Sequence, residues 1–93
     1  MKLPINYNDA NQVTRKKARE QYVEDQGKNC YHCRCSLEKK APKKITDKKI
    51  NWHLFPPFFL RYPIHLHHDH KTEMTIGAVH AYCNAVLWQY YGE

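Results

Sequence analysis

Hydrophobic and polar residues change their spacing several times along this 93-residue chain. Residues 14–26 combine helix-forming residues with a thin apolar stripe, and Gly27 follows at a position where helices commonly end. Residues 64–70 begin with alternating apolar and polar positions, and residues 75–80 form a second short run, so we expect a strand in each. The spacing over residues 81–91 is helical. The pattern therefore predicts a helix, two short strands and a final helix.

The segments between these elements lack such periodicity. Residues 28–36 are polar and dense in cysteine, which is typical of a tight turn such as a zinc knuckle. Residues 37–51 form a lysine-rich loop, and residues 52–63 concentrate aromatic residues among three prolines, which exclude a regular helix and disfavour a central strand. We expect the aromatic side chains to enter the core more readily than to form a platform for nucleotide bases; they are Trp52, Phe55, Phe58, Phe59 and Tyr62.

Composition restricts the classes to which the chain can belong. Its length fits one domain, assigned to residues 1–93. Fifteen lysines and arginines against nine acidic residues give a net charge of +6, and only 42% of residues are hydrophobic. So small a core often needs a metal or a disulfide to hold it. The chain has neither an apolar run long enough to span a membrane nor a signal-peptide pattern, so we expect a cytoplasmic protein with reduced cysteines.

Two separated residue pairs have the types and spacing of a zinc site. Cys30 and Cys33 are separated by two residues, the usual spacing for half of a tetrahedral site. His80 and Cys83 lie three positions apart at the start of the last predicted helix, so their side chains share one face. We favour a structural zinc bound by these four residues, and the alternative is a set of unpaired thiols. Cys35 is left without an assignment.

A dense histidine cluster follows the aromatic segment. Within six residues it contains four imidazoles and a carboxylate, from His65, His67, His68, Asp69 and His70. An apolar core does not accept so many imidazoles without polar partners, so the cluster indicates polar chemistry. A second metal site or a general base is the favoured interpretation, and a solvated histidine-rich loop is the alternative.

Together, the two clusters resemble the HNH, or ββα-metal, nucleases, and most closely the recombination endonuclease VII family of phages. That family has a CxxC pair, a stretch like HxDHDHxTG, and a strand ending in a second CxxC that is followed directly by Asn. Here Cys30 and Cys33 match the first pair, and Cys83 with Asn84 matches the last cysteine and the asparagine.

The resemblance implies a small zinc-stapled α+β fold. Residues 1–27 would form an N-terminal helical arm, and residues 28–93 would form the ββα-metal core with its long irregular basic and aromatic loop. His68 falls on the position of the general base, while His67 and Asn84 fall on positions that bind a catalytic divalent ion. The zinc would then be structural, because it would fix the start of the helix that carries Asn84.

The chain departs from the family pattern at three residue positions and in the loop from Cys33 to His67, which is longer than is typical of the family. His80 stands in place of a cysteine ligand, which zinc accepts equally well. His67 stands in place of a metal-binding aspartate. Because imidazole suits Ni²⁺ better than Mg²⁺, the catalytic ion is left open among Mg²⁺, Mn²⁺ and Ni²⁺. The Thr72-Glu73 pair replaces the family's usual Thr-Gly.

The activity implied is metal-dependent hydrolysis of phosphodiester bonds in DNA, by nicking or double-strand cutting, in the host cytoplasm if the gene is a phage gene. The basic charge supports contact with DNA phosphates, and the lysines assigned to it are Lys39, Lys40, Lys43, Lys44, Lys48 and Lys49. The alternative is a non-catalytic zinc module that binds nucleic acid or a protein. A homodimer is left open, since Tyr90 and Tyr91 could pack within the chain or between two copies.

Overall fold

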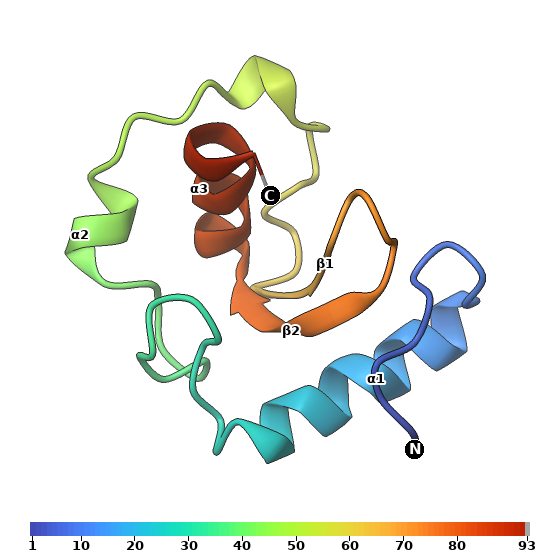
Figure 1. Cartoon of the computed structure of the whole chain (residues 1–93). Coiled ribbons are helices and arrows are strands. Elements are labelled where there is room, and N and C mark those ends of the chain that lie inside the picture. Colours follow the sequence, from blue (N-terminus) through green and yellow to red (C-terminus); the bar gives the residue numbers. More distant parts are fainter. Residues whose placement is uncertain (93) are drawn as a thin grey trace.

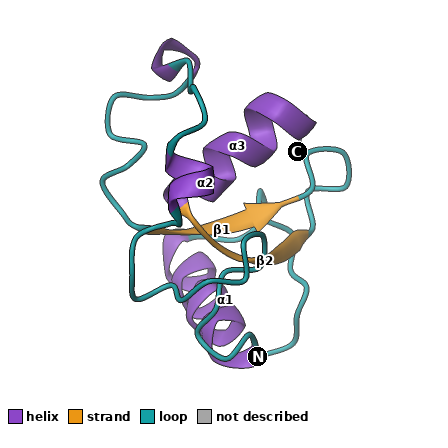
Figure 2. Cartoon of the chain, turned by 90° about the vertical axis from the view of Figure 1, so that its left-hand side faces the viewer, coloured by secondary structure: helices purple, strands orange, loops and turns teal. Residues whose placement is uncertain are grey.

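In the computed structural model, which describes residues 1–92, a two-stranded antiparallel hairpin lies between two helices (Figure 1 and Figure 2). Helix α1 (Gln12–Asp25) packs on one side of strands β1 (Ile64–His68) and β2 (Thr75–His80). Helix α3 (Ala81–Tyr91) follows β2 directly and covers the other side. The arrangement is a small α+β domain with a ββα-like unit, as the sequence predicted.

All four predicted elements are present, with ends within two residues of those expected. Helix α1 begins after Asn11, whose side-chain oxygen accepts a hydrogen bond of 2.8 Å from the backbone N–H of Thr14. It ends before Gly27, which takes the left-handed backbone conformation with φ 64° that closes many helices. No helix within residues 1–92 is long and apolar enough to cross a membrane.

Residues 1–27, which we expected to form an arm, are held against the hairpin. The backbone N–H of Tyr7 donates to the carbonyl oxygen of Glu73 at 2.8 Å. The Tyr22 hydroxyl of α1 lies 2.9 Å from Oγ1 of Thr75. These bonds position the N-terminal segment beside the end of β1.

The core gathers around the cysteine-rich turn. A short helix, α2 (Lys43–Thr46), was not predicted, and it places Ile45 against α3. The buried core cluster draws on the turn, α2, β2 and α3, and comprises Cys30, Leu37, Ile45, Ala78, Val79, Cys83, Val86 and Leu87. Because two of these residues are predicted metal ligands, the candidate zinc site is part of the core.

The prediction that the aromatic segment enters the core is wrong. Trp52, Phe58 and Tyr62 are 39%, 66% and 64% exposed, while Phe55 and Phe59 are half-buried. The prolines leave only a short 3-10 turn, η1 (Trp52–Leu54), so the segment arches around the outside of α3 (Figure 1). Its aromatic rings contact one another and Trp88 of α3.

Gln26, just after α1, ties this helix to β2. Its side-chain oxygen accepts from the backbone N–H of Ala78 at 2.8 Å, and its amide nitrogen donates to the carbonyl oxygens of Ala78 and Asn29. A Cβ atom at Gly77 would lie 2.7 Å from the Gln26 side-chain oxygen and 3.1 Å from the Tyr31 side chain. Glycine is therefore required there by the closeness of these neighbours.

We predict that Gly77→Ala destabilises the domain by about 1–3 kcal/mol, because the added methyl group displaces Gln26 from its backbone partners. Urea unfolding in excess zinc measures the change, and Lys17→Ala on the exposed surface of α1 should alter it by less than about 0.5 kcal/mol. Equal stability of Gly77→Ala and the wild type would show that the Gln26 clamp is dispensable.

Candidate metal centre and adjoining groove

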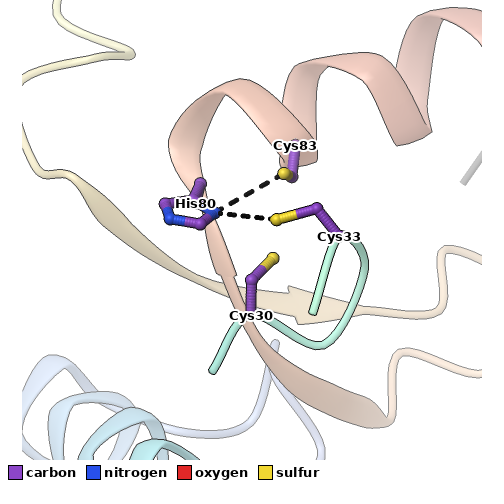
Figure 3. Close-up of side chains that lie close together, drawn as sticks. All are labelled: Cys30, Cys33, His80 and Cys83. Atoms are coloured by element: carbon purple, nitrogen blue, oxygen red, sulfur yellow. Dashed lines mark hydrogen bonds between the residues drawn. The ribbon is translucent and has the colours of Figure 1, made fainter. Parts of the chain in front are cut away.

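The predicted zinc ligands come together where the cysteine-rich turn meets the β2–α3 junction (Figure 3). One sulfur or nitrogen atom from each of Cys30, Cys33, His80 and Cys83 lies within 4.8 Å of all the others. Nδ1 of His80 is 3.4 Å from Sγ of Cys33 and 3.6 Å from Sγ of Cys83. Small adjustments would bring each atom to the zinc distances of about 2.3 Å for sulfur and 2.0–2.1 Å for nitrogen.

The orientation of the His80 ring fits a metal ligand. Its Nε2 atom is 2.9 Å from the carbonyl oxygen of Ser36 and 3.0 Å from that of Lys39. A carbonyl oxygen only accepts, so Nε2 carries the hydrogen, and the lone pair of the neutral ring is on Nδ1. Nδ1 is the atom that faces the sulfurs, and such a carbonyl partner on the far nitrogen is usual for zinc-binding histidines.

The sulfur atoms also show the electrostatics of a cation site. A hydrogen bond from the Cys83 thiol is the largest cause that lowers the pKa of Cys30, to about 4. Backbone N–H groups act in the same direction, and burial opposes them. The Cys30 sulfur and burial in turn raise the pKa of Cys83, and burial raises that of Cys33. Of the three sulfurs only that of Cys30 is readily ionised without a metal, whereas a bound divalent ion would hold all three as thiolates.

This donor set is consistent with a structural Zn²⁺, as the sequence predicted. All four cysteines are free of disulfides. Cys35 is exposed and its thiol contacts the carbonyl oxygen of Cys33 at 3.6 Å, outside the group of four. Among the described residues, the histidines of the 65–70 cluster do not join a second group of three or more Cys, His, Asp or Glu ligand atoms.

Asn84, the residue after the ligand Cys83, connects two of these histidines. Its side-chain oxygen lies 3.3 Å from Nδ1 of His67, and its amide nitrogen donates to Nδ1 of His65 at 3.1 Å. His67 is 3% exposed, and burial is the largest cause that lowers the pKa of His65. The side-chain amide of Asn84, in the first turn of α3, thus links two imidazoles of β1, through its oxygen to His67 and through its nitrogen to His65.

His68 does not share the contacts of His65 and His67 with Asn84 but packs beside Tyr7 and Glu73. Its ring stacks on Tyr7 with the centroids 4.0 Å apart, and its Nε2 atom lies 3.7 Å from a carboxylate oxygen of Glu73. Burial, followed by the neighbouring His70, lowers the pKa of His68, whereas Glu73 acts in the opposite direction. A β-bulge between His67 and His68 accompanies this change of direction.

Two acidic residues near His68 have local roles in the turn between the strands. Asp69 accepts hydrogen bonds from the backbone N–H groups of Lys71 and Thr72, and these bonds lower its pKa. Glu73 has φ 64°, the left-handed conformation that favours glycine. The turn therefore has at Glu73 a backbone conformation that suits glycine, and it places a carboxylate beside His68.

A groove of about 960 Å³ opens above these side chains. Its floor includes His65, His67, His68 and Asn84. One part of its lining is aromatic and comes from residues 54–62, and another part is α1 with Arg15, Lys16 and Arg19. The predicted DNA-binding lysines are all exposed, but none lines this groove: Lys39, Lys40, Lys43, Lys44, Lys48 and Lys49.

Sequence reasoning missed several residues that surround the histidines. Arg15 and Arg19 are four positions apart, so the predicted helix already placed them on one face, and this spacing could have identified the cationic wall. No pattern pointed to Tyr7, because its contact with His68 joins two distant parts of the chain. The role of Glu73 depends on the turn conformation, which spacing alone does not encode.

Comparisons of this chain with models of protein families, with curated proteins and with solved structures find no match. What supports the resemblance to the ββα-metal nucleases is therefore the order of the motifs, the ββα-like unit and the group of four zinc-type ligands.

We predict that the purified protein contains about one zinc per chain and that removing the zinc unfolds it, because these ligands join segments of the core. Cys83→Ser should lower zinc content and thermal stability, whereas Cys35→Ser should leave both unchanged. Elemental analysis and circular dichroism provide the measurements. A metal-free chain that remains folded with reduced thiols would contradict the assignment.

Proposed function

We propose that the chain is a metal-dependent DNA endonuclease in which a structural zinc holds an HNH-type site. The observation that carries this proposal is the position of Asn84. It directly follows a zinc-type ligand on α3 and contacts His67 and His65 on the floor of the groove. A module that only binds zinc would not need this polar network beside its metal site.

The side chains support separate tasks at such a site. His68 is the proposed general base, because a neutral imidazole can accept the proton of an attacking water near neutral pH. The stacked Tyr7 ring and the Glu73 carboxylate restrict the orientation of His68. His67 and Asn84 present nitrogen and oxygen donors, a mixed set that fits Mn²⁺, Ni²⁺ or Zn²⁺ better than Mg²⁺. A divalent ion held there would supply positive charge for the phosphate and the leaving oxygen.

DNA is the proposed partner, and both basic regions of the chain favour it. The groove carries cations beside the histidines, and the six exposed lysines lie in α2 and the loops next to it, outside the groove lining. The phosphates of the DNA backbone can contact the groove cations and the six lysines alike, and such contacts do not depend on the base sequence.

Relaxation of supercoiled plasmid tests the activity in zinc-loaded protein with Mg²⁺, Mn²⁺ or Ni²⁺ added separately. His68→Ala should lower the cleavage rate on the order of 10²–10⁴-fold, because the loss of a general base affects the transition state. Zinc content, folding and DNA affinity should remain near those of the wild type. His53→Ala is the matched control, since His53 is exposed and lies outside the groove.

Substitutions of His67 test the second ion. His67→Ala should raise the concentration of divalent ion needed for cleavage, and His67→Asp should shift the preference toward Mg²⁺, because carboxylate oxygen suits this ion better than imidazole. Rates across a concentration series of each ion measure both effects.

The results separate an enzyme from a non-catalytic zinc module. Cleavage by His68→Ala at the wild-type rate would show that His68 is not the general base. A zinc-loaded, DNA-binding protein that cleaves with none of the ions would favour the non-catalytic alternative.

The exposed lysines provide an independent prediction for duplex binding. Replacing four of them with glutamine should weaken binding and reduce its dependence on salt, by about 0.9 in the logarithmic slope for each phosphate that the variant no longer neutralises; the four are Lys43, Lys44, Lys48 and Lys49. Titrations at several salt concentrations measure the slope. An unchanged slope would place these lysines outside the DNA-binding surface.

A further inference from the structure

We propose that the groove binds an unpaired nucleic-acid strand, with its phosphates along α1 and its bases against the exposed rings of residues 54–62. The inference rests on the proposed endonuclease function and narrows its substrate to DNA that contains an unpaired segment. It follows from the two kinds of side chain that line the groove beside the histidines, which are aromatic rings from residues 54–62 and cations from α1.

The aromatic residues of segment 54–62 expose ring faces, and other residues of the segment hold it in place. Phe58 and Tyr62 border the groove and are 66% and 64% exposed. In the same segment, the centroid of the Phe59 ring lies 4.7 Å from that of His65 on the floor, and the centroid of the Phe55 ring lies 5.4 Å from that of Trp88. Such contacts hold the segment while its outer rings face solvent. Exposed aromatic side chains on a fixed support are the usual platforms for stacking of unpaired bases.

The wall formed by α1 is cationic, and one of its cations is held in place by neighbouring groups. The Arg15 guanidinium lies 4.0 Å above the Tyr7 ring, and its Nε donates to the Tyr7 carbonyl oxygen at 2.9 Å. Lys16 is exposed, and Arg19 is close enough to the floor for its charge to lower the pKa of His65. No aspartate or glutamate is among the described residues that line the groove. The charge of this wall therefore complements a polyanion.

The pairing of these walls favours an unpaired strand over a regular duplex. In a duplex the base faces are covered by their stacked neighbours, so they are closed to Phe58 and Tyr62. An unpaired strand can offer phosphates to one wall and base faces to the other at the same time. The groove, at about 960 Å³, has the size of a large ligand pocket and accepts a short stretch of such a strand.

Fluorescence anisotropy tests the inference with labelled oligo-dT, oligo-U and a mixed-sequence duplex of equal length, without added divalent ions. Gel analysis confirms that each oligonucleotide stays intact. The wild type should bind the single strands more tightly than the duplex. Phe58→Ala and Tyr62→Ala should each weaken single-strand binding by on the order of 5- to 100-fold, with a smaller effect on the duplex. Comparison of oligo-dT with oligo-U shows whether the groove distinguishes DNA from RNA.

The chain offers a matched control for the aromatic residues of the groove and another for its cations. Tyr91→Ala removes an exposed tyrosine away from the groove, and Lys17→Gln removes a cation from α1 that does not line it. Neither should change single-strand affinity, whereas Lys16→Gln with Arg19→Gln should reduce the salt slope by about 0.7 for each phosphate that is no longer neutralised.

The binding experiment can fail or succeed independently of the plasmid cleavage assay. Single-strand affinities of Phe58→Ala and Tyr62→Ala equal to the wild type would overturn the inference, even if these variants still cleave plasmid. Loss of self-association in these variants, with oligonucleotide binding intact, would overturn it as well and assign the rings to an interface between two copies. Selective loss of single-strand binding would support it, including in a protein that cleaves no DNA.

Discussion

The hydrogen bonds between Nε2 of the buried His80 ring and two backbone carbonyl groups determine how the metal ligands of this fold are arranged. Carbonyl oxygens of Ser36 and Lys39 hold the ring so that its other nitrogen faces the cysteine sulfurs. His80 is also the last residue of β2 and precedes the first residue of α3. One imidazole thus joins the cysteine-rich turn, the hairpin and the final helix. In a chain of this size, a metal bound at such a junction can replace the apolar area that a larger domain would bury.

The same junction fixes the site beside it. Asn84 is one residue beyond Cys83, so a metal bound by Cys83 also positions Asn84 relative to β1. The hairpin supplies the partners, because β1 is paired along its length with the strand that leads into α3. A metal at the Cys30, Cys33, His80 and Cys83 site would therefore affect the hydrogen bonds of Asn84 through α3, although Asn84 is not one of its ligands.

Local sequence signals predicted much of this arrangement, and non-local contacts account for most of what they missed. Helical and alternating periods located α1, the hairpin and α3, and short cysteine and histidine spacings located the metal ligands. Hydrophobicity alone misplaced the aromatic segment. It predicts burial for Phe58 and Tyr62, but the prolines keep their backbone from packing as a regular element against the core. The Tyr7 contact with His68 had no local signature, because the fold and not the spacing brings these residues together.

The distribution of charge separates the two kinds of basic residue in the chain. The lysines of the long loop project from short or irregular backbone, where they add net charge with little geometric precision. The arginines of α1 sit on a helix that is packed against the hairpin, and Arg15 is further held by Tyr7, which itself stacks on His68. Guanidinium groups fixed in this way can set the distance between a bound phosphate and the histidines. The arginines of α1 therefore matter more for the chemistry proposed in the groove than the more numerous lysines of the loop, because the arginines are held on a packed helix.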